Sequence, residues 1–192
     1  MKRPARSVLR PYARAMNPRR SLLILVGAVA AFVVTQLFMS AILGDLTSKL
    51  LELETTFSED RFAGILSGLS EAEITKLRQS IQLDFLYALL YGFMLWWGVR
   101  MVNGLTPLNR STYRLWSAAA IVAASLDYVE NLSHLYLIDH RDAIAPLAIM
   151  VTGSVSWLKW AIALAVLGFL IWHLPRALFR SRVSATPWAH AC

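Results

Sequence analysis

The chain has 192 residues, of which 57% are hydrophobic and 16% are charged. A soluble domain carries about a quarter charged residues, so the composition excludes an ordinary soluble protein and indicates an integral membrane protein with one domain. The net charge is +7, but the basic residues gather beside the apolar segments. That placement is typical of cytoplasmic loops and anionic lipid headgroups and excludes nucleic acid as the expected partner.

The chain begins with a basic segment, residues 1–20, that we expect to form a cytoplasmic tail. An apolar run follows at about 21–43. This run is long enough to cross a membrane as a helix. We therefore interpret it as a retained signal anchor rather than a cleaved signal peptide.

Residues 45–80 form the longest connection, and it is the acidic one, with seven acidic and four basic side chains. Its leucines and phenylalanines recur at helical spacing, which predicts two short amphipathic helices that lie on the outer membrane surface or cap the bundle. Ser58 is a suitable N-cap for the second of them. Ser70 and Glu73 have the spacing of a capping box, which predicts a helix that starts at Glu71 and continues into the next span. We expect this outer loop to be the surface for any membrane-protein partner.

Three further apolar runs predict three more spans. With the first, the predicted spans are at about 21–43, 81–102, 113–138 and 145–172, within a membrane domain of residues 21–174. Pro175 is expected to stop the last helix, and residues 175–192 form a second basic tail. The predicted fold class is an all-α integral membrane protein, a four-transmembrane-helix bundle with short amphipathic helices in the first outer loop.

The distribution of basic residues predicts the orientation of this bundle. Both tails and the connection between the second and third spans are basic, whereas residues 45–80 are acidic. Because cytoplasmic loops are enriched in lysine and arginine, we expect both termini to be cytoplasmic. The expected location is a bacterial-type inner membrane.

Four polar residues stand out in the third predicted span. Asp127, Glu130, Asn131 and His134 fall at i, i+3, i+4 and i+7, so a helix presents them on one face. Ionisable side chains within a membrane are costly and usually face a bundle interior or a water-filled cavity. The stripe is therefore a candidate functional site.

Other spans add polar residues at the same predicted depth. Asp84 comes from the outer half of the second span, and the fourth span adds Lys159 near its middle and Ser156 above it towards the outside. We therefore predict one outward-opening polar pocket. The candidate catalytic residues are Asp84, Asp127, Glu130 and His134, and the candidate substrate-binding residues are Asn131, Ser156 and Lys159.

The charges of this site leave its chemistry open between several interpretations. Three carboxyl groups and one ammonium group cannot all remain ionised in a bundle interior without a further positive charge. One remedy is a divalent metal ion held by Asp84, Asp127, Glu130 and His134. Another is protonation, which suits metal-free acid–base chemistry in which neighbouring carboxyl groups take different roles.

Three further interpretations use the same residues. Ser156 and Lys159 have the spacing of a serine–lysine nucleophile pair, although this spacing often occurs by chance. A chain of Asp127, Glu130 and His134 is typical of a proton or cation relay. The residues could equally join helices in a scaffold or accessory subunit. We expect an enzyme that acts on a membrane lipid or another small amphipathic substrate, with a scaffold or a proton- or cation-coupled transporter as the alternatives.

Overall fold

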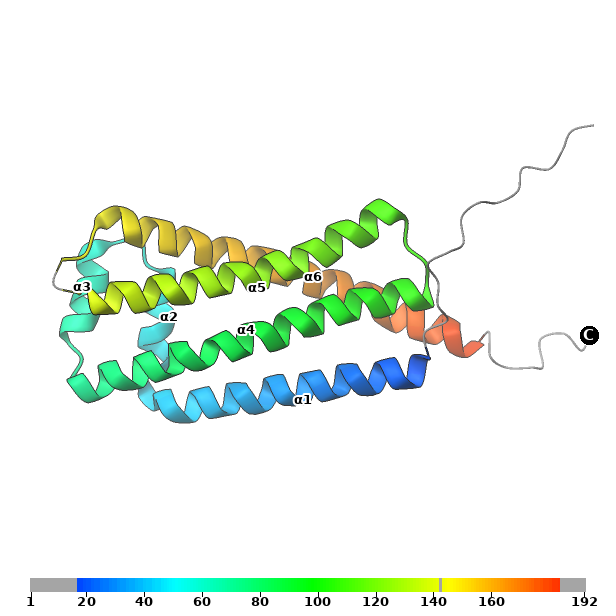
Figure 1. The fold of residues 1–192 in the computed structure, drawn as a ribbon, viewed down its shortest axis with the longest axis horizontal. Helices are drawn as coiled ribbons and strands as arrows, with labels where there is room; N and C mark the ends of the chain where they lie inside the picture. The colour runs from blue at the N-terminus through cyan, green and yellow to red at the C-terminus, as the bar shows by residue number, and fades with distance from the viewer. Residues whose placement is uncertain (1–16, 142, 184–192) are drawn as a thin grey trace, which may run out of the picture.

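The computed structural model describes residues 17–141 and 143–183, and within this part of the chain the protein is all-helical with no strand (Figure 1). The elements are α1 (Pro18–Leu43), η1 (Gly44–Leu46), α2 (Thr47–Thr55), α3 (Glu59–Ser67), α4 (Glu71–Leu105), α5 (Arg110–Asp139) and α6 (Pro146–Val183). Most of residues 1–20 and the last residues of the 175–192 tail lie outside the described residues.

Side-chain caps explain where several helices begin. Ser70 and Glu73 form the predicted capping box, in which the Glu73 side chain accepts a hydrogen bond from the Ser70 amide at 2.8 Å. Ser58 caps α3, and Asn109 caps α5 by accepting a hydrogen bond from the Thr112 amide at 2.8 Å. These caps satisfy backbone N–H groups that have no partner within the first turn of a helix. The predictions for Ser58 and for a helix start at Glu71 are confirmed.

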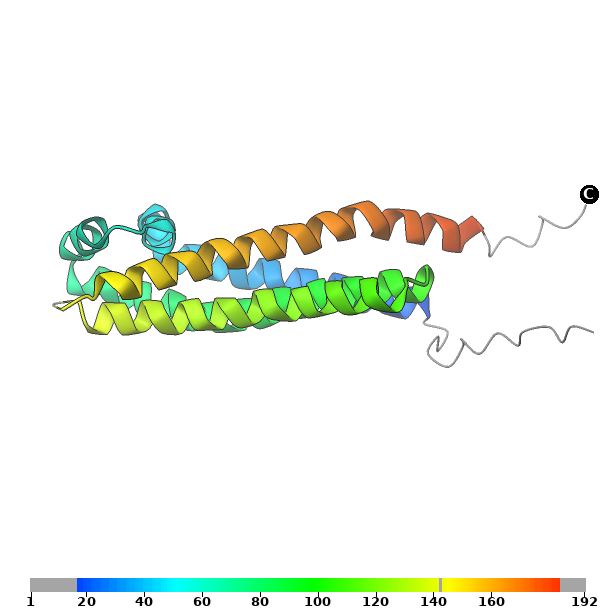
Figure 2. The same cartoon turned by 90° about the horizontal axis from the view of Figure 1, so that it is seen from above.

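The four long helices lie side by side. In Figure 1, α4 and α5 run antiparallel and α1 lies along α4, while α6 packs against both α4 and α5. The short helices α2 and α3 lie together at one end of the bundle and contact α6 there (Figure 2). We call this end, which also contains the connection between α5 and α6, the capped end, and the opposite end the basic end.

The two predicted amphipathic helices are α2 and α3. Their apolar faces are buried, with Leu50 and Leu53 on α2 and Phe62 and Leu66 on α3. The loop between them packs directly onto α6 at Gly153, where an added Cβ would lie 2.9 Å from the Thr56 carbonyl oxygen. A side chain at position 153 would therefore push this cap away from the bundle.

Three helical segments among the described residues are long and apolar enough to cross a membrane. They are Arg19–Thr55, which runs through α1, η1 and α2, then Glu71–Leu105 and Pro146–Arg180. These segments are typical of a membrane protein. Helix α5, the predicted third span, is not among them, because its polar stripe lowers the hydropathy of a helix that is otherwise long enough.

One predicted boundary is wrong. Helix α6 continues through Pro175 to Val183, although we expected that proline to end the helix. Proline removes one backbone N–H, but the chain can continue as a bent helix where other groups satisfy the freed carbonyl. The freed carbonyl is that of Ile171, four residues before Pro175, and at the next carbonyl along, that of Trp172, the Arg176 side chain donates a hydrogen bond. Figure 2 shows that α6 is bent.

Two apolar clusters fill the bundle on either side of a polar layer. The cluster at the capped end is built on buried residues such as Phe62, Leu77 and Leu137. The cluster toward the basic end includes Leu95, Val99 and other buried residues of α4, α5 and α6. The polar stripe of α5 lies between these clusters, which places the candidate site within the apolar core.

Candidate functional site

Helix α5 buries its polar stripe in the centre of the bundle. Asp127, Glu130, Asn131 and His134 are each no more than 5% exposed. The prediction that these four residues share an inward face is thus confirmed by their burial. Because charged and amide groups are costly to bury without partners, their contacts determine what the site can do.

Lys159 on α6 is the cation of the site. Its ammonium nitrogen lies 2.6 Å from Glu130 Oε2 and 3.4 Å from Asp127 Oδ1. Ser156, one turn away on the same helix, donates a hydrogen bond from its hydroxyl to Glu130 Oε1 at 2.8 Å. Both carboxylate oxygens of Glu130 therefore have partners on α6, and the ion pair joins α5 to α6.

Asn131 connects this ion pair to α4. Its side-chain amide donates a hydrogen bond to Asp84 Oδ2 at 2.7 Å and a longer one to Asp127 Oδ1 at 3.4 Å. About two turns toward the basic end from the Asn131–Asp84 contact, the Tyr91 hydroxyl donates a hydrogen bond to the Ala123 carbonyl at 2.9 Å and also holds α4 against α5. We call the connected set of Asp84, Asp127, Glu130, Asn131, Ser156 and Lys159 the polar network.

His134 is the predicted site residue that does not join the polar network. Its ring is 3% exposed, yet neither ring nitrogen has a hydrogen-bond partner. Its nearest ring neighbour is Phe62 of α3, with centroids 6.3 Å apart in an edge-to-face arrangement. His134 thus faces apolar side chains at the capped end rather than the carboxylates.

Glu54 on α2 is a residue that the sequence analysis missed. This half-buried carboxylate interacts electrostatically with Lys159, which attracts it, and with Glu130 and Asp127, which repel it. Glu54 lies four residues after the buried Leu50, so it extends the inward face of α2. That spacing was the signal that could have identified it.

With Glu54 included, four carboxyl groups surround one ammonium group. These four carboxyl groups cannot all be ionised beside a single ammonium group, because an uncompensated charge in a low-dielectric interior is very costly. The polar network must therefore carry protons or hold a cation. This property distinguishes it from a single structural ion pair.

The four predicted metal ligands are not gathered around one point. Among the described residues, no group of three or more histidine, cysteine, aspartate or glutamate side chains is placed to hold a metal ion. Lys159 lies against Glu130 and Asp127, and His134 faces Phe62. The predicted metal ligands are Asp84, Asp127, Glu130 and His134. In the structure the Lys159 ammonium group occupies the space beside Glu130 and Asp127, and the Phe62 ring lies against His134, so these side chains do not converge on one point.

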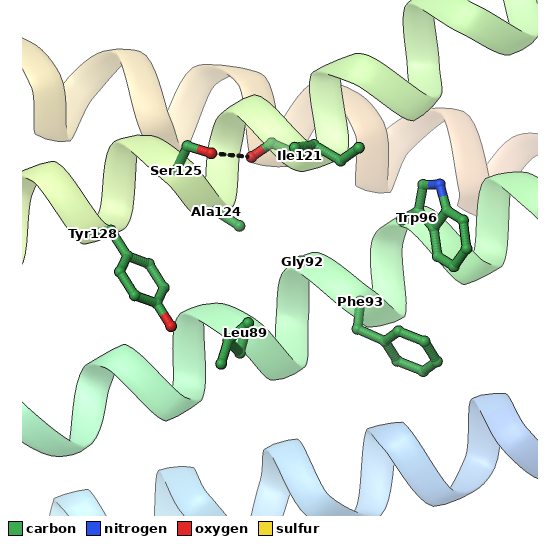
Figure 3. A pocket seen from close by; sticks show the side chains of 8 residues that line it. All are labelled: Leu89, Gly92, Phe93, Trp96, Ile121, Ala124, Ser125 and Tyr128. Atoms are coloured by element: carbon green, nitrogen blue, oxygen red, sulfur yellow. Dashed lines mark hydrogen bonds between the residues drawn. The ribbon is translucent and has the colours of Figure 1, made fainter.

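Two surface pockets lie beside the polar network instead of opening onto it. One, of about 670 Å³, lies between α4 and α5, and Figure 3 shows its lining. Its lining residues are Leu89, Gly92, Phe93, Trp96, Ile121, Ala124, Ser125 and Tyr128. The other, of about 510 Å³, lies between α5 and α6 and includes Thr152. The six residues of the polar network contact one another and line neither pocket.

No protein-family model, no curated protein and no solved structure matches this chain. The function must therefore be argued from the polar network and its surroundings.

Proposed function

We propose that this protein is an integral membrane enzyme that carries out acid–base chemistry on a membrane lipid or another small membrane-soluble molecule. The observation that carries the proposal is the excess of carboxyl groups around Lys159, two of them buried (Asp127 and Glu130) and two half-buried (Asp84 and Glu54). Neighbouring carboxyl groups that share too few counter-charges divide the roles of acid and base between them. A buried carboxyl group that carries a proton in the resting enzyme can donate that proton to a bound substrate.

The contacts suggest a role for each residue. Glu130 exchanges a proton with the substrate, and Ser156 and Lys159 hold its two oxygens in a fixed orientation. Asp127 is the second proton carrier, connected to Asp84 through Asn131. Lys159 stabilises negative charge that develops on the substrate. In this assignment Ser156 positions Glu130 and is not a nucleophile.

The proposal includes the topology inferred from the sequence. We take α5 as a fourth span, with the basic end in the cytoplasm and the capped end outside a bacterial-type inner membrane. Arginines at the basic end, such as Arg100 stacked on Trp96 and Trp97, support this orientation. The acidic residues of α2 and α3, including Glu59 and Asp60, leave the capped end available to a membrane-protein partner.

A scaffold or accessory subunit is the second candidate, and one observation favours it. The ion pair, Asn131 and Ser156 join α4, α5 and α6 to one another, as a purely structural network would. A transporter receives less support, because the core between the polar network and the basic end is an apolar cluster. A proton relay needs ionisable or hydrated groups along its whole length.

The test compares the wild-type protein with Glu130→Gln, which keeps the size of the side chain. Membranes from cells with and without the protein are extracted, and their lipids and lipophilic metabolites are compared by mass spectrometry. Loss of a general acid or base should lower the rate of product formation about a hundredfold or more. Glu71→Gln, at an exposed carboxylate of the capped end, is the matched control and should leave product formation unchanged.

Thermal melting in detergent separates the two candidates. If Glu130→Gln lowers stability and changes no metabolite, the network is structural and the enzyme proposal is wrong. Elemental analysis of the purified protein, before and after a chelator, tests the metal interpretation separately. A stoichiometric divalent ion whose removal abolishes product formation would replace acid–base chemistry with metal-assisted chemistry.

A further inference from the structure

Two buried polar side chains beside the polar network have no hydrogen-bond partner. They are His134 on α5, whose two ring nitrogens are both unpartnered, and Ser80 on α4, whose hydroxyl is unpartnered. His134 is 3% exposed and Ser80 is fully buried. Leaving a buried polar group without a partner costs about 1–3 kcal/mol, so natural proteins rarely do so without a functional reason.

The packing of α4 against α5 places these two residues at the same level. The Asn131–Asp84 hydrogen bond fixes the register of the two antiparallel helices. Ser80 lies one turn from Asp84 toward the capped end, and His134 lies one turn from Asn131 in the same direction. The two unpartnered residues therefore lie in one layer next to the polar network.

This layer has an apolar roof and a charged floor. Phe62, which is 1% exposed, extends from α3 over the imidazole of His134. On the other side, Glu130 is four residues before His134 on the same face of α5. Whatever binds between His134 and Ser80 therefore contacts apolar groups above and lies close to the carboxylate that we assign to proton exchange.

We propose that His134 and Ser80 bind an uncharged hydroxyl group, and that the substrate of the proposed enzyme is a membrane-soluble alcohol. A neutral imidazole offers one N–H and one lone pair, and the Ser80 hydroxyl both donates and accepts. A hydroxyl group also both donates and accepts, so it satisfies both residues at once. This inference rests on the proposed function, because it names the substrate class of the same site.

Charged headgroups fit the layer less well. An anion would lie next to a network with more carboxyl groups than cations, and a cation would meet the field of Lys159, which acts on His134. Either charge would also have to lose its water beneath Phe62, which an apolar roof does not compensate. An uncharged hydroxyl on an apolar chain avoids both penalties.

Binding is tested by nuclear magnetic resonance on protein with ¹⁵N-labelled histidine, in nanodiscs of phosphatidylcholine and phosphatidylglycerol. The probes are hexadecanol and three molecules with the same chain length: hexadecane, hexadecanoate and hexadecylamine. We expect hexadecanol to shift the ring signals of His134 and the other three probes to leave them in place. His140 is an internal control, because its ring is exposed and stacked on Tyr136.

Variants locate the site. The signal of His134 is assigned from its loss in His134→Gln. Ser80→Ala removes one hydrogen-bond partner, so it should weaken hexadecanol binding about tenfold without moving the signals of the free protein. His140→Gln is the matched control and should bind hexadecanol as the wild type does. Because Ser80→Ala only deletes an unpartnered hydroxyl, it is not expected to impair folding.

Several outcomes would overturn this inference. An equal response to hexadecane, or an unshifted His134 signal at saturating hexadecanol, would show that no hydroxyl binds there. A shift with glycerol but not with hexadecanol would assign the layer to a water-soluble alcohol and contradict the membrane-soluble class. The two tests can fail separately. If hexadecanol does not bind while Glu130→Gln still abolishes product formation, the substrate class is wrong and the enzyme proposal stands. If hexadecanol binds while Glu130→Gln changes no product, the enzyme proposal is refuted, and only the binding of a hydroxyl group by His134 and Ser80 remains.

Discussion

Among single residues, the contact between Lys159 and Glu130 has the largest predicted effect on stability. Lys159→Met keeps the length of the side chain but removes the cation of the polar network. Glu130 and Asp127 then remain buried without their counter-charge. Removing one partner of a buried pair costs about 3–5 kcal/mol, so we expect a clearly lower melting temperature in detergent. Ser154→Ala, at an exposed position of α6, should leave it unchanged.

The double variant Lys159→Met/Glu130→Gln tests the reason for this effect. If the loss comes from an uncompensated carboxylate, neutralising Glu130 should recover part of the melting temperature, and the two substitutions should be strongly non-additive. Additive losses would mean that Lys159 stabilises the bundle through packing of its alkyl chain. The prediction concerns stability alone and holds for an enzyme and for a scaffold.

The candidate site was predictable from the sequence only as far as helical spacing determines it. The spacing of Asp127, Glu130 and Asn131 identified the buried face of α5, because a regular helix leaves no freedom in which residues share a face. The position of His134 against Phe62, and of Glu54 near Lys159, depends on how α2 and α3 fold onto the bundle. No local pattern specifies that packing.

Among the elements, α4 and α5 pack tightly against each other where Gly92 meets Ala124. A Cβ added to Gly92 would lie 2.5 Å from Ala124 Cβ, closer than two carbon atoms can pack. Gly92→Ala should therefore push the helices apart and cost about 1–3 kcal/mol, even though alanine favours a helix. Thermal melting in detergent measures the loss.

Two variants control for helix propensity at this crossing. Gly27 on α1 has no atom within 4 Å of an added Cβ, so Gly27→Ala should be neutral or stabilising by up to about 1 kcal/mol. The exchange Gly92→Ala/Ala124→Gly returns the lost space and should restore most of the melting temperature. If the double variant melts no higher than Gly92→Ala alone, the loss of stability does not come from the close packing of Gly92 against Ala124.

The elements themselves show which local signals can be trusted. Caps at Ser58 and Ser70 predicted where α3 and α4 begin, because a cap is a contact within a few residues of chain. The prediction at Pro175 was wrong because a helix can bend at a proline and continue where its packing favours it, as α6 does to Val183. The start of a helix can therefore be predicted from a few neighbouring residues, whereas the effect of a proline on a helix depends on the packing around it.

For the whole molecule, the decisive question is whether α5 crosses the membrane. Its 30 residues span about 45 Å, more than a bilayer core of about 30 Å, and its polar stripe is buried against α4 and α6. Hydropathy averages over all faces of a helix and so undervalues one whose polar face never meets lipid. The faces of α5 that point outward include exposed Leu115, Ile121 and Leu132.

The topology can be measured with single cysteines, because Cys192 is the one cysteine of the chain and can be replaced by serine. Exposed test positions are Ser67 on α3, Pro107 between α4 and α5, and His140 after α5. In spheroplasts, a membrane-impermeant maleimide should label Ser67→Cys and His140→Cys but not Pro107→Cys. Pro107→Cys should be labelled only after the membrane is opened with detergent.

The label at position 140 decides between four spans and three. If α5 crosses, positions 67 and 140 face the same side, and the capped end forms one exposed surface above the polar network. If α5 does not cross, position 140 reports the same side as position 107, and α2 and α3 could not cover α5 from outside. That result would contradict the packing of Phe62 on His134. It would also refute the substrate class that we infer from His134 and Ser80.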